Sequence, residues 1–143
     1  MNLYAESSAV LGWLLGEARG PEAQQLLASA EIVSCSDLTF MECGRVLIRA
    51  ARLGKLSETE AADCQRLLTA AAHKWKVFRI SREIAERVQR PFPKEPVRSL
   101  DAIHLASALA VRAVIPNLEI LSLDGRIRDS ASGLGFKLQP RIE

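Results

Sequence analysis

Four acidic side chains have the chemistry to form a reactive site, provided that the fold brings them together: Glu6, Glu42, Asp101 and Asp124. Ionised carboxylates about 4 Å apart repel one another by about 4 kcal/mol at an effective dielectric constant of about 20. Such a cluster either raises the pKa values until some acids are protonated, or binds a hard divalent cation. Mg²⁺ or Mn²⁺ suits carboxylate and water ligands, and could orient a water molecule and stabilise charge on a phosphate during in-line hydrolysis.

Asp101 stands near the start of an almost wholly apolar segment, residues 98–110, which is predicted to form a helix with Leu100 at its first position. Ser99 is predicted to cap this helix, which places Asp101 in the first turn, where unpaired backbone N–H groups favour an anion. Because the segment has hardly any polar face, the helix is predicted to be largely buried. The carboxylate then either stabilises the helix dipole by a few tenths to about 1 kcal/mol, or serves as a cation ligand or acid–base group.

Predicted strands alternate with predicted helices along the whole chain. The strands are expected at 2–5, 31–35, 76–80 and 118–123, with a possible last edge strand at 136–138. Capping patterns begin three of the intervening helices: Ser7 or Ser8, the capping box of Ser57 and Glu60, and Ser81. This alternation predicts an α/β fold, a three-layer α/β/α sandwich with a mostly parallel central sheet of four to five strands.

A parallel sheet would bring the four acids to one edge, because every strand ends there and each following helix starts there. Each acid also has a structural explanation. Glu6 could assist a helix N-terminus, and Glu42 could pair with Arg45 on a solvated helix face. Asp124 precedes a glycine in a common turn pair. Their predicted convergence favours the metal site over these separate explanations.

The bulk composition limits the function only loosely. With 143 residues, 48% of them hydrophobic, and no repeat or linker, the chain is expected to form a single domain over residues 1–143. A formal net charge of +2 is too small to indicate a dedicated electrostatic binder of nucleic acid, although basic residues could still gather on one face. The three cysteines lack a CxxC pair and are expected to be ordinary buried or half-buried thiols. No leader or membrane span is apparent, so we expect a soluble, cytoplasmic protein.

Four segments spread over nearly the whole chain carry a resemblance to a known family. They are LYAESSAV at 3–10, SDLTFME at 36–42, SLDAIHLA at 99–106 and LSLD at 121–124. Each motif is weak alone, but their order and spacing resemble those of PIN-domain proteins. Within that family, the chain is most similar to the VapC-type ribonuclease toxins of bacterial toxin–antitoxin pairs.

The resemblance implies a PIN-like sheet between helices and a metal-dependent endoribonuclease that hydrolyses RNA phosphodiester bonds. Carried over position by position, it implies these site residues: Glu42, Asp101, Asp124 and Glu6 as catalytic acids that bind Mg²⁺ or Mn²⁺, and Ser8 and Ser122 as polar supports. It also implies a homodimer that a small antitoxin protein neutralises.

Glu6 departs from the family pattern, which usually has Asp at this position. The extra methylene moves the carboxylate by more than about 1 Å, and such a displacement can cost catalysis about 100-fold. The alternative is therefore a catalytically degenerate PIN domain that binds RNA or an antitoxin without cutting. A flavodoxin-like phospho-acceptor domain is disfavoured, because the first strand lacks an acidic pair and no lysine ends a late strand.

Several other side chains lie close to these motifs in the sequence. His104 follows Asp101 by three residues and could act as a proton shuttle, but a packed or hydrogen-bonded structural histidine is the favoured interpretation. Basic residues around the proline-rich loop could contact RNA phosphates, namely Arg79, Arg82, Arg90, Lys94 and Arg98. Trp13 could belong to the core or to a partner surface, with the core as the default.

Overall fold

Five short strands form a parallel sheet at the centre of the computed structural model, which describes residues 1–142. In chain order they are β1 (Asn2–Ala5), β2 (Ile32–Ser36), β3 (Lys76–Phe78), β4 (Leu118–Leu121) and β5 (Lys137–Gln139). The spatial order is β3-β2-β1-β4-β5, and every neighbouring pair is parallel. The predicted fold class is confirmed, and so is the edge strand near the C-terminus.

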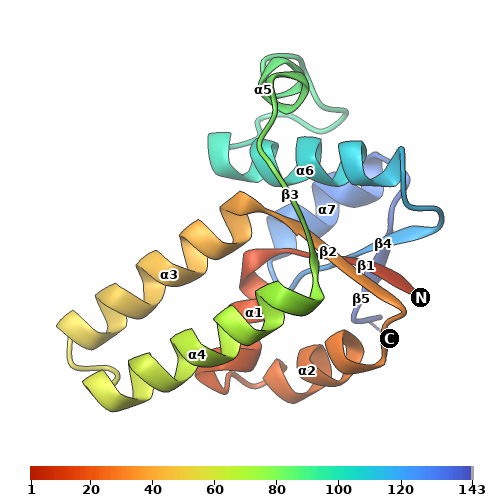
Figure 1. The fold of residues 1–143 in the computed structure, drawn as a ribbon. Helices are drawn as coiled ribbons and strands as arrows, with labels where there is room; N and C mark the ends of the chain where they lie inside the picture. Colours follow the sequence, from red (N-terminus) through yellow and green to blue (C-terminus); the bar gives the residue numbers. More distant parts are fainter. Residues whose placement is uncertain (143) are drawn as a thin grey trace.

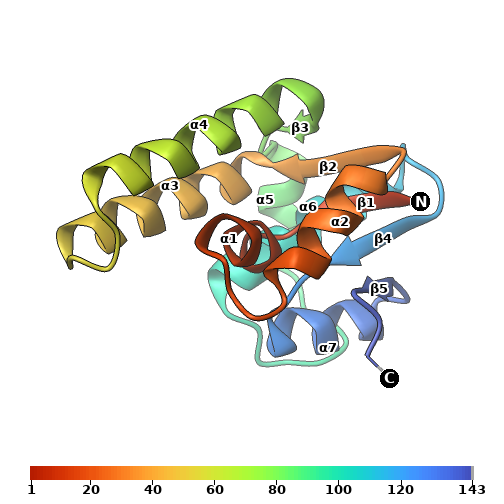
Figure 2. The same ribbon diagram turned by 90° about the horizontal axis from the view of Figure 1, so that it is seen from below.

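Helices cover both faces of the sheet (Figures 1 and 2). One face carries α1 (Ser7–Leu15), α2 (Gly20–Ser29), α3 (Asp37–Arg52) and α4 (Glu58–Lys74). The other carries α5 (Arg82–Val88), α6 (Ser99–Arg112) and α7 (Gly125–Gly133). Strand β1 serves both cores, since Leu3 and Ala5 pack beneath the first group of helices and Tyr4 packs beneath the second. In Figure 1, α3 and α4 form a hairpin that extends away from the sheet.

The predicted helix starts are partly confirmed. The capping box of Ser57 and Glu60 is present at α4, and Ser81 caps α5 by accepting from the Ile84 N–H. The prediction of a serine cap at α1 is wrong. Its N-cap is Glu6, whose carboxylate accepts from the Ser8 N–H, because a charged acceptor forms a stronger bond than a hydroxyl.

The start of α6 also differs from the prediction. Its N-cap is Arg98, and Ser99 is the first helical residue and makes no capping bond. The proline-rich loop stays extended up to Arg98, so the helix begins at the first residue after it. Asp101 nevertheless lies in the first turn, as predicted. The helix is buried over most of its length, although Leu100 is 50% exposed.

The three cysteines and the lengths of the helices agree with the sequence analysis. Cys35, Cys43 and Cys64 are free and buried, as predicted. Burial raises the pKa of the Cys35 and Cys43 thiols to about 12, which leaves them almost wholly protonated at neutral pH. Within residues 1–142, no helix is long and apolar enough to cross a membrane.

Two glycines let α1 and α2 approach closely. A Cβ atom at Gly20 would lie 2.1 Å from the backbone oxygen of Gly12, so any side chain there forces the helices apart. We expect Gly20→Ala to lower the free energy of unfolding by about 1–3 kcal/mol. Gly44→Ala is the matched control. It lies within α3, has no atom within 4 Å of its added Cβ, and should raise stability by about 0.5–1 kcal/mol. Denaturant unfolding of the two variants would measure both effects, and a neutral Gly20→Ala would contradict the packing argument.

Candidate active site at the carboxyl edge of the sheet

All four predicted acids lie at the edge of the sheet where the strands end. Glu6 follows β1 and caps α1, and Glu42 lies in the second turn of α3, which follows β2. Asp101 lies in the first turn of α6, and Asp124 follows β4 and caps α7. Thr39 ties α3 to the end of β1 by donating to the Ala5 carbonyl at 2.9 Å. The crossover geometry of the parallel sheet therefore sets this arrangement, as the sequence predicted.

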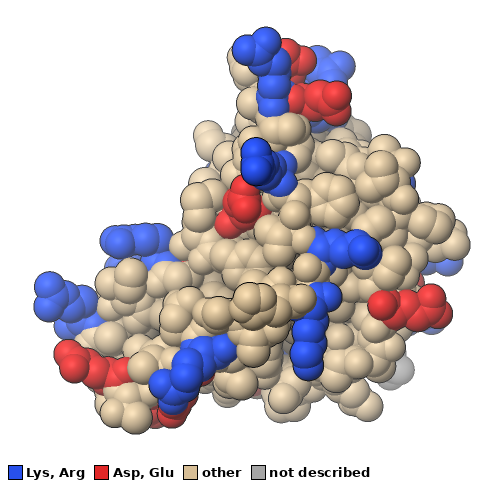
Figure 3. Space-filling view, in the orientation of Figure 1, with Lys and Arg blue, Asp and Glu red and all other residues tan. Residues whose placement is uncertain are grey.

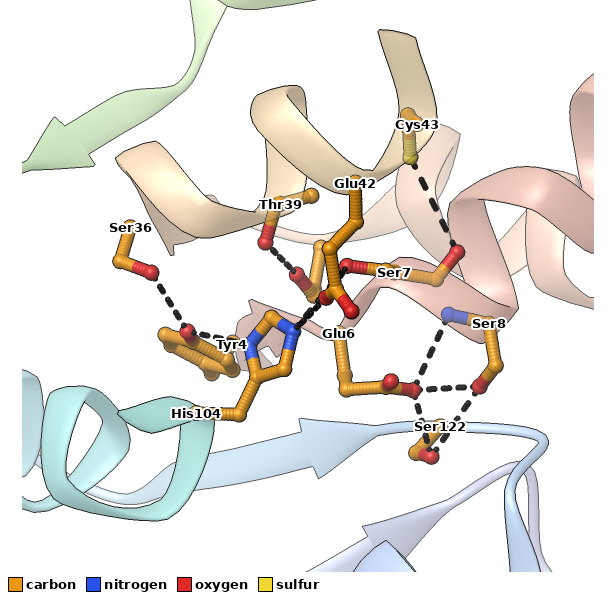
Figure 4. Close-up of polar contacts among 11 residues, drawn as sticks. Tyr4, Glu6, Ser7, Ser8, Ser36, Thr39, Glu42, Cys43, His104 and Ser122 are labelled. Atoms are coloured by element: carbon orange, nitrogen blue, oxygen red, sulfur yellow. Dashed lines mark hydrogen bonds and ion pairs between the residues drawn. The ribbon is translucent and has the colours of Figure 1, made fainter. Parts of the chain in front are cut away.

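Glu6 is buried at 5% exposure and points into a small polar cluster (Figure 4). Its Oε2 accepts hydrogen bonds from the Ser8 N–H at 3.1 Å, from the Ser122 hydroxyl at 2.8 Å and from the Ser8 hydroxyl. Burial raises the pKa of Glu6, although these donors and the nearby His104 oppose the shift. Its Oε1 makes no hydrogen bond to any described residue. This oxygen is also not among the fully buried polar atoms, so it is accessible to solvent. The Glu6 side chain, one methylene longer than aspartate, thus has Oε2 fixed by hydrogen bonds and Oε1 free to bind a ligand.

Ser8 and Ser122 join Glu6 to the turn that carries Asp124. The Ser8 hydroxyl accepts from the Leu123 N–H at 2.8 Å, and the Ser122 hydroxyl accepts from the Asp124 N–H at 3.1 Å. Both serines therefore contact an acid and the backbone of the neighbouring turn at once. This geometry is what their predicted role as polar supports requires.

Glu42 is held by two donors from other elements. Its Oε1 lies 2.7 Å from the Ser7 hydroxyl and 2.5 Å from His104 Nε2. Burial alone would raise the pKa of Glu42, but the hydrogen bonds from His104 and Ser7 outweigh it and hold the pKa below its usual range. The alternative explanation, an ion pair with Arg45, is not found among the described residues, and Glu42 instead faces Ser7 and His104.

Asp101 and Asp124 complete the edge. Asp124 uses Oδ1 to accept from the N–H groups of Arg126 and Ile127, at 2.8 and 3.1 Å. Burial raises the pKa of Asp101, and the negative charges of Asp124 and Glu42 raise it further, against the opposing charges of Arg126 and His104. Asp101 thus lies in the combined field of two other acids, which is the condition that attracts a cation.

Arg128 is a structural residue that the sequence analysis missed. It is 9% exposed, and its guanidinium donates to the carbonyls of Ser122, Gln139 and Pro140 at 2.9, 3.0 and 2.7 Å. It therefore joins the end of β4 to the end of β5, beside the serine that contacts Glu6. An arginine in a short polar helix resembles a surface charge, as the neighbouring Arg126 is, so the sequence carries no signal for this role.

Residues 3–132 match the family model described as PIN domain. The chain belongs to the PIN domain family. A curated relative of this PIN domain, named ribonuclease VapC45 from Mycobacterium tuberculosis (strain CDC 1551 / Oshkosh), is 28% identical over 138 residues, which cover 96% of this chain and 94% of the relative. Among solved structures, a toxin–antitoxin complex from Klebsiella pneumoniae matches with a TM-score of 0.61 and 24% identity, covering 93% of this chain and 94% of that chain.

A further solved structure supports the same fold. The crystal structure of Mycobacterium tuberculosis VapC20, described as a sarcin-ricin loop cleaving toxin, has a TM-score of 0.63 and 22% identity to this PIN domain. It covers 94% of this chain and 95% of its own. At such identities the likeness establishes the fold, and the family resemblance inferred from the four motifs is confirmed by the family match.

PIN-domain nucleases depend in general on a divalent metal ion, and the donor chemistry of this edge fits one. Each of Glu6, Glu42 and Asp124 has one carboxylate oxygen engaged by protein donors and the other without a hydrogen bond to any described residue. Carboxylate oxygens are the ligands that hard divalent cations prefer. Over residues 1–142, no three His, Cys, Asp or Glu side chains are grouped closely enough to hold one ion as they stand. The four acids lie at the same edge of the sheet, and the charges of Asp124 and Glu42 act on Asp101. The carboxylates of Glu6 and Glu42 are hydrogen-bonded to neighbouring side chains.

The predicted RNA contacts of this PIN domain are all exposed, and they lie on α5 and the loops beside it: Arg79, Arg82, Arg90, Lys94 and Arg98. In the view of Figure 3, basic side chains over α3, α4 and α5 are separated by uncharged surface and do not gather in one patch. Nearest the acids is a cavity of about 440 Å³ whose lining includes Lys94, Arg98, Asp101 and Arg126. Arg126 was not predicted from the sequence, although it follows the Asp124 turn directly.

The raised pKa of Glu6 predicts how stability depends on pH. The folded PIN domain holds this proton more tightly than the unfolded chain, so the free energy of unfolding falls as the pH rises from about 4.3 through the raised pKa. Glu6→Gln keeps an acceptor for Ser8 and Ser122 and removes the charge. In chelator, we expect it to be more stable than the unchanged protein at pH 7–8 and equal to it near pH 4.

Glu60→Gln is a control of opposite sign. Hydrogen bonds to the backbone and side chain of Ser57 lower the pKa of Glu60, so its contribution is present at neutral pH and lost as the pH falls. This variant should be less stable at pH 7, with the difference vanishing in acid. Thermal unfolding across the pH range measures both variants. A Glu6→Gln protein less stable than the unchanged one at pH 7 would show that the Glu6 charge is favourable where it lies.

Proposed function

We propose that this PIN domain is a metal-dependent endoribonuclease, the toxin component of a type II toxin–antitoxin system, which hydrolyses RNA phosphodiester bonds. The observation that carries the proposal is that four acids lie at one edge of the sheet: Glu6, Glu42, Asp101 and Asp124. Burial and the negative charges of Asp124 and Glu42 raise the pKa of Asp101 there. A relative that spans nearly the whole chain is named a ribonuclease. The alternative, a degenerate domain that binds RNA or antitoxin without cutting, is not favoured by these relatives.

We assign the metal site to Glu42, Asp101, Asp124 and Glu6, with Mg²⁺ or Mn²⁺ as the ion. When bound, the ion supplies a water molecule of lowered pKa and neutralises charge on the phosphate. Glu42 is the best prepared ligand, because its lowered pKa keeps it ionised and its Oε1 is already fixed. Asp101 gains most from a cation, because burial and Asp124 raise its pKa when no cation opposes them.

The side chains around the cavity beside Asp101 are proposed to bind the RNA backbone. Arg126 and Arg98 line it without a described carboxylate partner within 4 Å, so their guanidinium groups are free to contact phosphate. Lys94 lies 2.9 Å from Asp129, and this exposed pair would have to open for Lys94 to contact RNA. Arg79, Arg82 and Arg90 extend the proposed RNA contacts away from the acids.

For the antitoxin we propose an apolar groove on the α2–α4 side of the protein. The groove has a volume of about 530 Å³, and its lining includes Trp13, Leu27, Leu67 and Trp75. Leu67 is 49% exposed there, and an apolar segment of a partner would cover it. The chain has two tryptophans, and both line this groove. Intrinsic fluorescence therefore reports on it, and an antitoxin that leaves the fluorescence unchanged would bind elsewhere.

A homodimer is proposed through the outer face of α3. Met41 and Ile48 are 51% and 52% exposed, and their spacing of seven residues along this helix places them on one face. Pairing with the same face of a second copy would bury them. Light scattering should give twice the mass of the chain, and Ile48→Lys should shift the protein to monomer. A protein that is monomeric at all concentrations would contradict this assembly.

Cleavage of RNA tests the proposed function directly. A mixture of structured RNAs should be cut internally in Mg²⁺ or Mn²⁺, cutting should stop in excess chelator, and it should return when the ion is restored. Cleavage that persists in chelator would contradict the metal site. RNA that binds but stays intact with either ion would favour the degenerate domain instead.

A further inference from the structure

His104 is buried and has both ring nitrogens engaged (Figure 4). It is 2% exposed, and its Nε2 lies 2.5 Å from Glu42 Oε1 and 3.0 Å from the Ser7 hydroxyl. On the opposite side of the ring, Nδ1 lies 2.9 Å from the Tyr4 hydroxyl. The ring therefore connects a core tyrosine beneath the sheet edge to an acid of the proposed active site.

The protonation of the two neighbours sets the direction of the bond to Glu42. The Glu42 Oε1 atom already accepts from the Ser7 hydroxyl at 2.7 Å, and a carboxylate has no proton to donate at neutral pH, so it accepts from His104 Nε2–H. Burial raises the pKa of Tyr4, so Tyr4 remains a phenol throughout the neutral range. The Tyr4 hydroxyl is itself held 3.1 Å from the Ser36 hydroxyl at the end of β2. Ser36, Tyr4, His104 and Glu42 thus form one continuous chain of hydrogen bonds.

This chain of hydrogen bonds crosses four elements of the fold. Ser36 ends β2, Tyr4 lies on β1, His104 on α6 and Glu42 on α3. An aliphatic or aromatic residue at position 104 would fill the core without burying a polar ring. The imidazole instead directs its donor at a carboxylate that is 27% exposed and could have been solvated by water. Core packing alone therefore does not explain a histidine here.

We infer that His104, oriented by Tyr4, is a positioning residue that fixes the Glu42 carboxylate for metal binding. Oε1 is held by His104 and Ser7, and Oε2 has no hydrogen bond to a described residue. This inference rests on the proposed function, since it assigns a purpose to Glu42 as a metal ligand. Hydrogen-bonded partners of metal ligands typically change metal affinity or activity by about 10- to 100-fold when they are removed.

Binding of Mn²⁺ without RNA gives a readout separate from activity. Tyr4→Phe keeps the ring and removes only the hydroxyl that orients His104, and His104→Gln keeps a donor but loses the second contact. We expect Tyr4→Phe and His104→Gln to raise the Kd for Mn²⁺ by about 10- to 100-fold in calorimetry. The metal concentration for half-maximal cleavage should rise in parallel, while the KM for RNA stays the same.

The matched control is Ser34→Ala. Ser34 is a buried serine on β2 that donates to the Leu3 carbonyl at 2.9 Å, outside this chain of hydrogen bonds. It should cost stability and leave the Kd for Mn²⁺ unchanged. Folded Tyr4→Phe and His104→Gln proteins that bind Mn²⁺ as tightly as the unchanged protein would overturn the inference.

NMR of the metal-free protein separates this inference from the proposed function. A slowly exchanging His104 Nε2–H signal is expected in the unchanged protein, with faster exchange in Tyr4→Phe. Absence of that signal overturns the positioning role even if the protein cleaves RNA. If the signal is present but the unchanged protein binds no Mn²⁺, the proposed metal site is wrong, and the role of His104 toward it is wrong as well.

Discussion

Asp101→Asn should lose about 10²- to 10³-fold of the ribonuclease rate while melting at a higher temperature than the unchanged protein in chelator. The loss follows because a metal ion supplies several kcal/mol of charge stabilisation in the transition state, and Asp101 is assigned as one of its ligands. The gain follows because burial and the charge of Asp124 disfavour the ionised Asp101 carboxylate in the metal-free protein. Cleavage kinetics in Mn²⁺ and thermal unfolding in chelator measure the two effects.

Asp63→Asn is the control for Asp101→Asn. Asp63 lies on α4, is exposed, and pairs only with Arg66 one turn along the same helix. Because exposed pairs contribute about 0–1 kcal/mol, this variant should change neither the cleavage rate nor the melting temperature appreciably. Undiminished cleavage by Asp101→Asn would remove Asp101 from the metal site. A melting temperature of Asp101→Asn below that of the unchanged protein in chelator would show that the ionised Asp101 carboxylate is stabilised by its surroundings even without metal.

Arg128→Met should be the most destabilising of the substitutions considered. The variant keeps most of the side-chain volume but leaves the carbonyls of Ser122 and Pro140 without their donor, while the Gln139 carbonyl keeps its hydrogen bond from the Ser122 N–H at 3.0 Å. Buried acceptors without a partner cost about 1–3 kcal/mol each, so a loss of about 2–4 kcal/mol is expected after partial rescue by water. That corresponds to a fall of about 5–15 °C in melting temperature. Calorimetry in the absence of metal measures it.

Arg126→Met separates this effect from the general loss of a positive charge. Arg126 lies two residues earlier in α7, is exposed, and donates only through its backbone to Asp124. Its substitution should leave the free energy of unfolding within about 0.5 kcal/mol of the unchanged protein. Equal melting temperatures for Arg126→Met and Arg128→Met would contradict the structural role of Arg128.

The architecture could be predicted from the sequence because it depends on local patterns. Alternating strands and helices specify a parallel sheet, and a parallel sheet fixes where each strand ends, so the common edge of Glu6, Glu42, Asp101 and Asp124 followed. The Ser57 capping box was likewise predictable, because its partner lies only three residues away. The Ser81 cap was predicted on the same local grounds, whereas the serine caps predicted for α1 and α6 were wrong.

The contacts that orient the acids could not be predicted in the same way. His104 meets Tyr4 and Glu42 across about 100 and about 60 positions of the chain, and only the packing of α6 under β1 and α3 creates that meeting. The favoured interpretation, a hydrogen-bonded histidine, is confirmed, but nothing in the sequence indicated that its partner is an acid of the site. The wrong cap at α1 has a similar origin, since Ser8 and Ser122 meet on Glu6 only after folding.

Titration of Mn²⁺ into the metal-free protein, without RNA, shows whether the carboxyl edge of the sheet binds a metal ion. If the carboxyl edge of the sheet is a metal site, calorimetry will show saturable binding to the unchanged protein and at least about tenfold weaker binding to Asp101→Asn, while Asp63→Asn binds as the unchanged protein does. Binding of equal affinity to all three proteins, or no binding to any of them, would contradict the assignment of this edge as the site of catalysis.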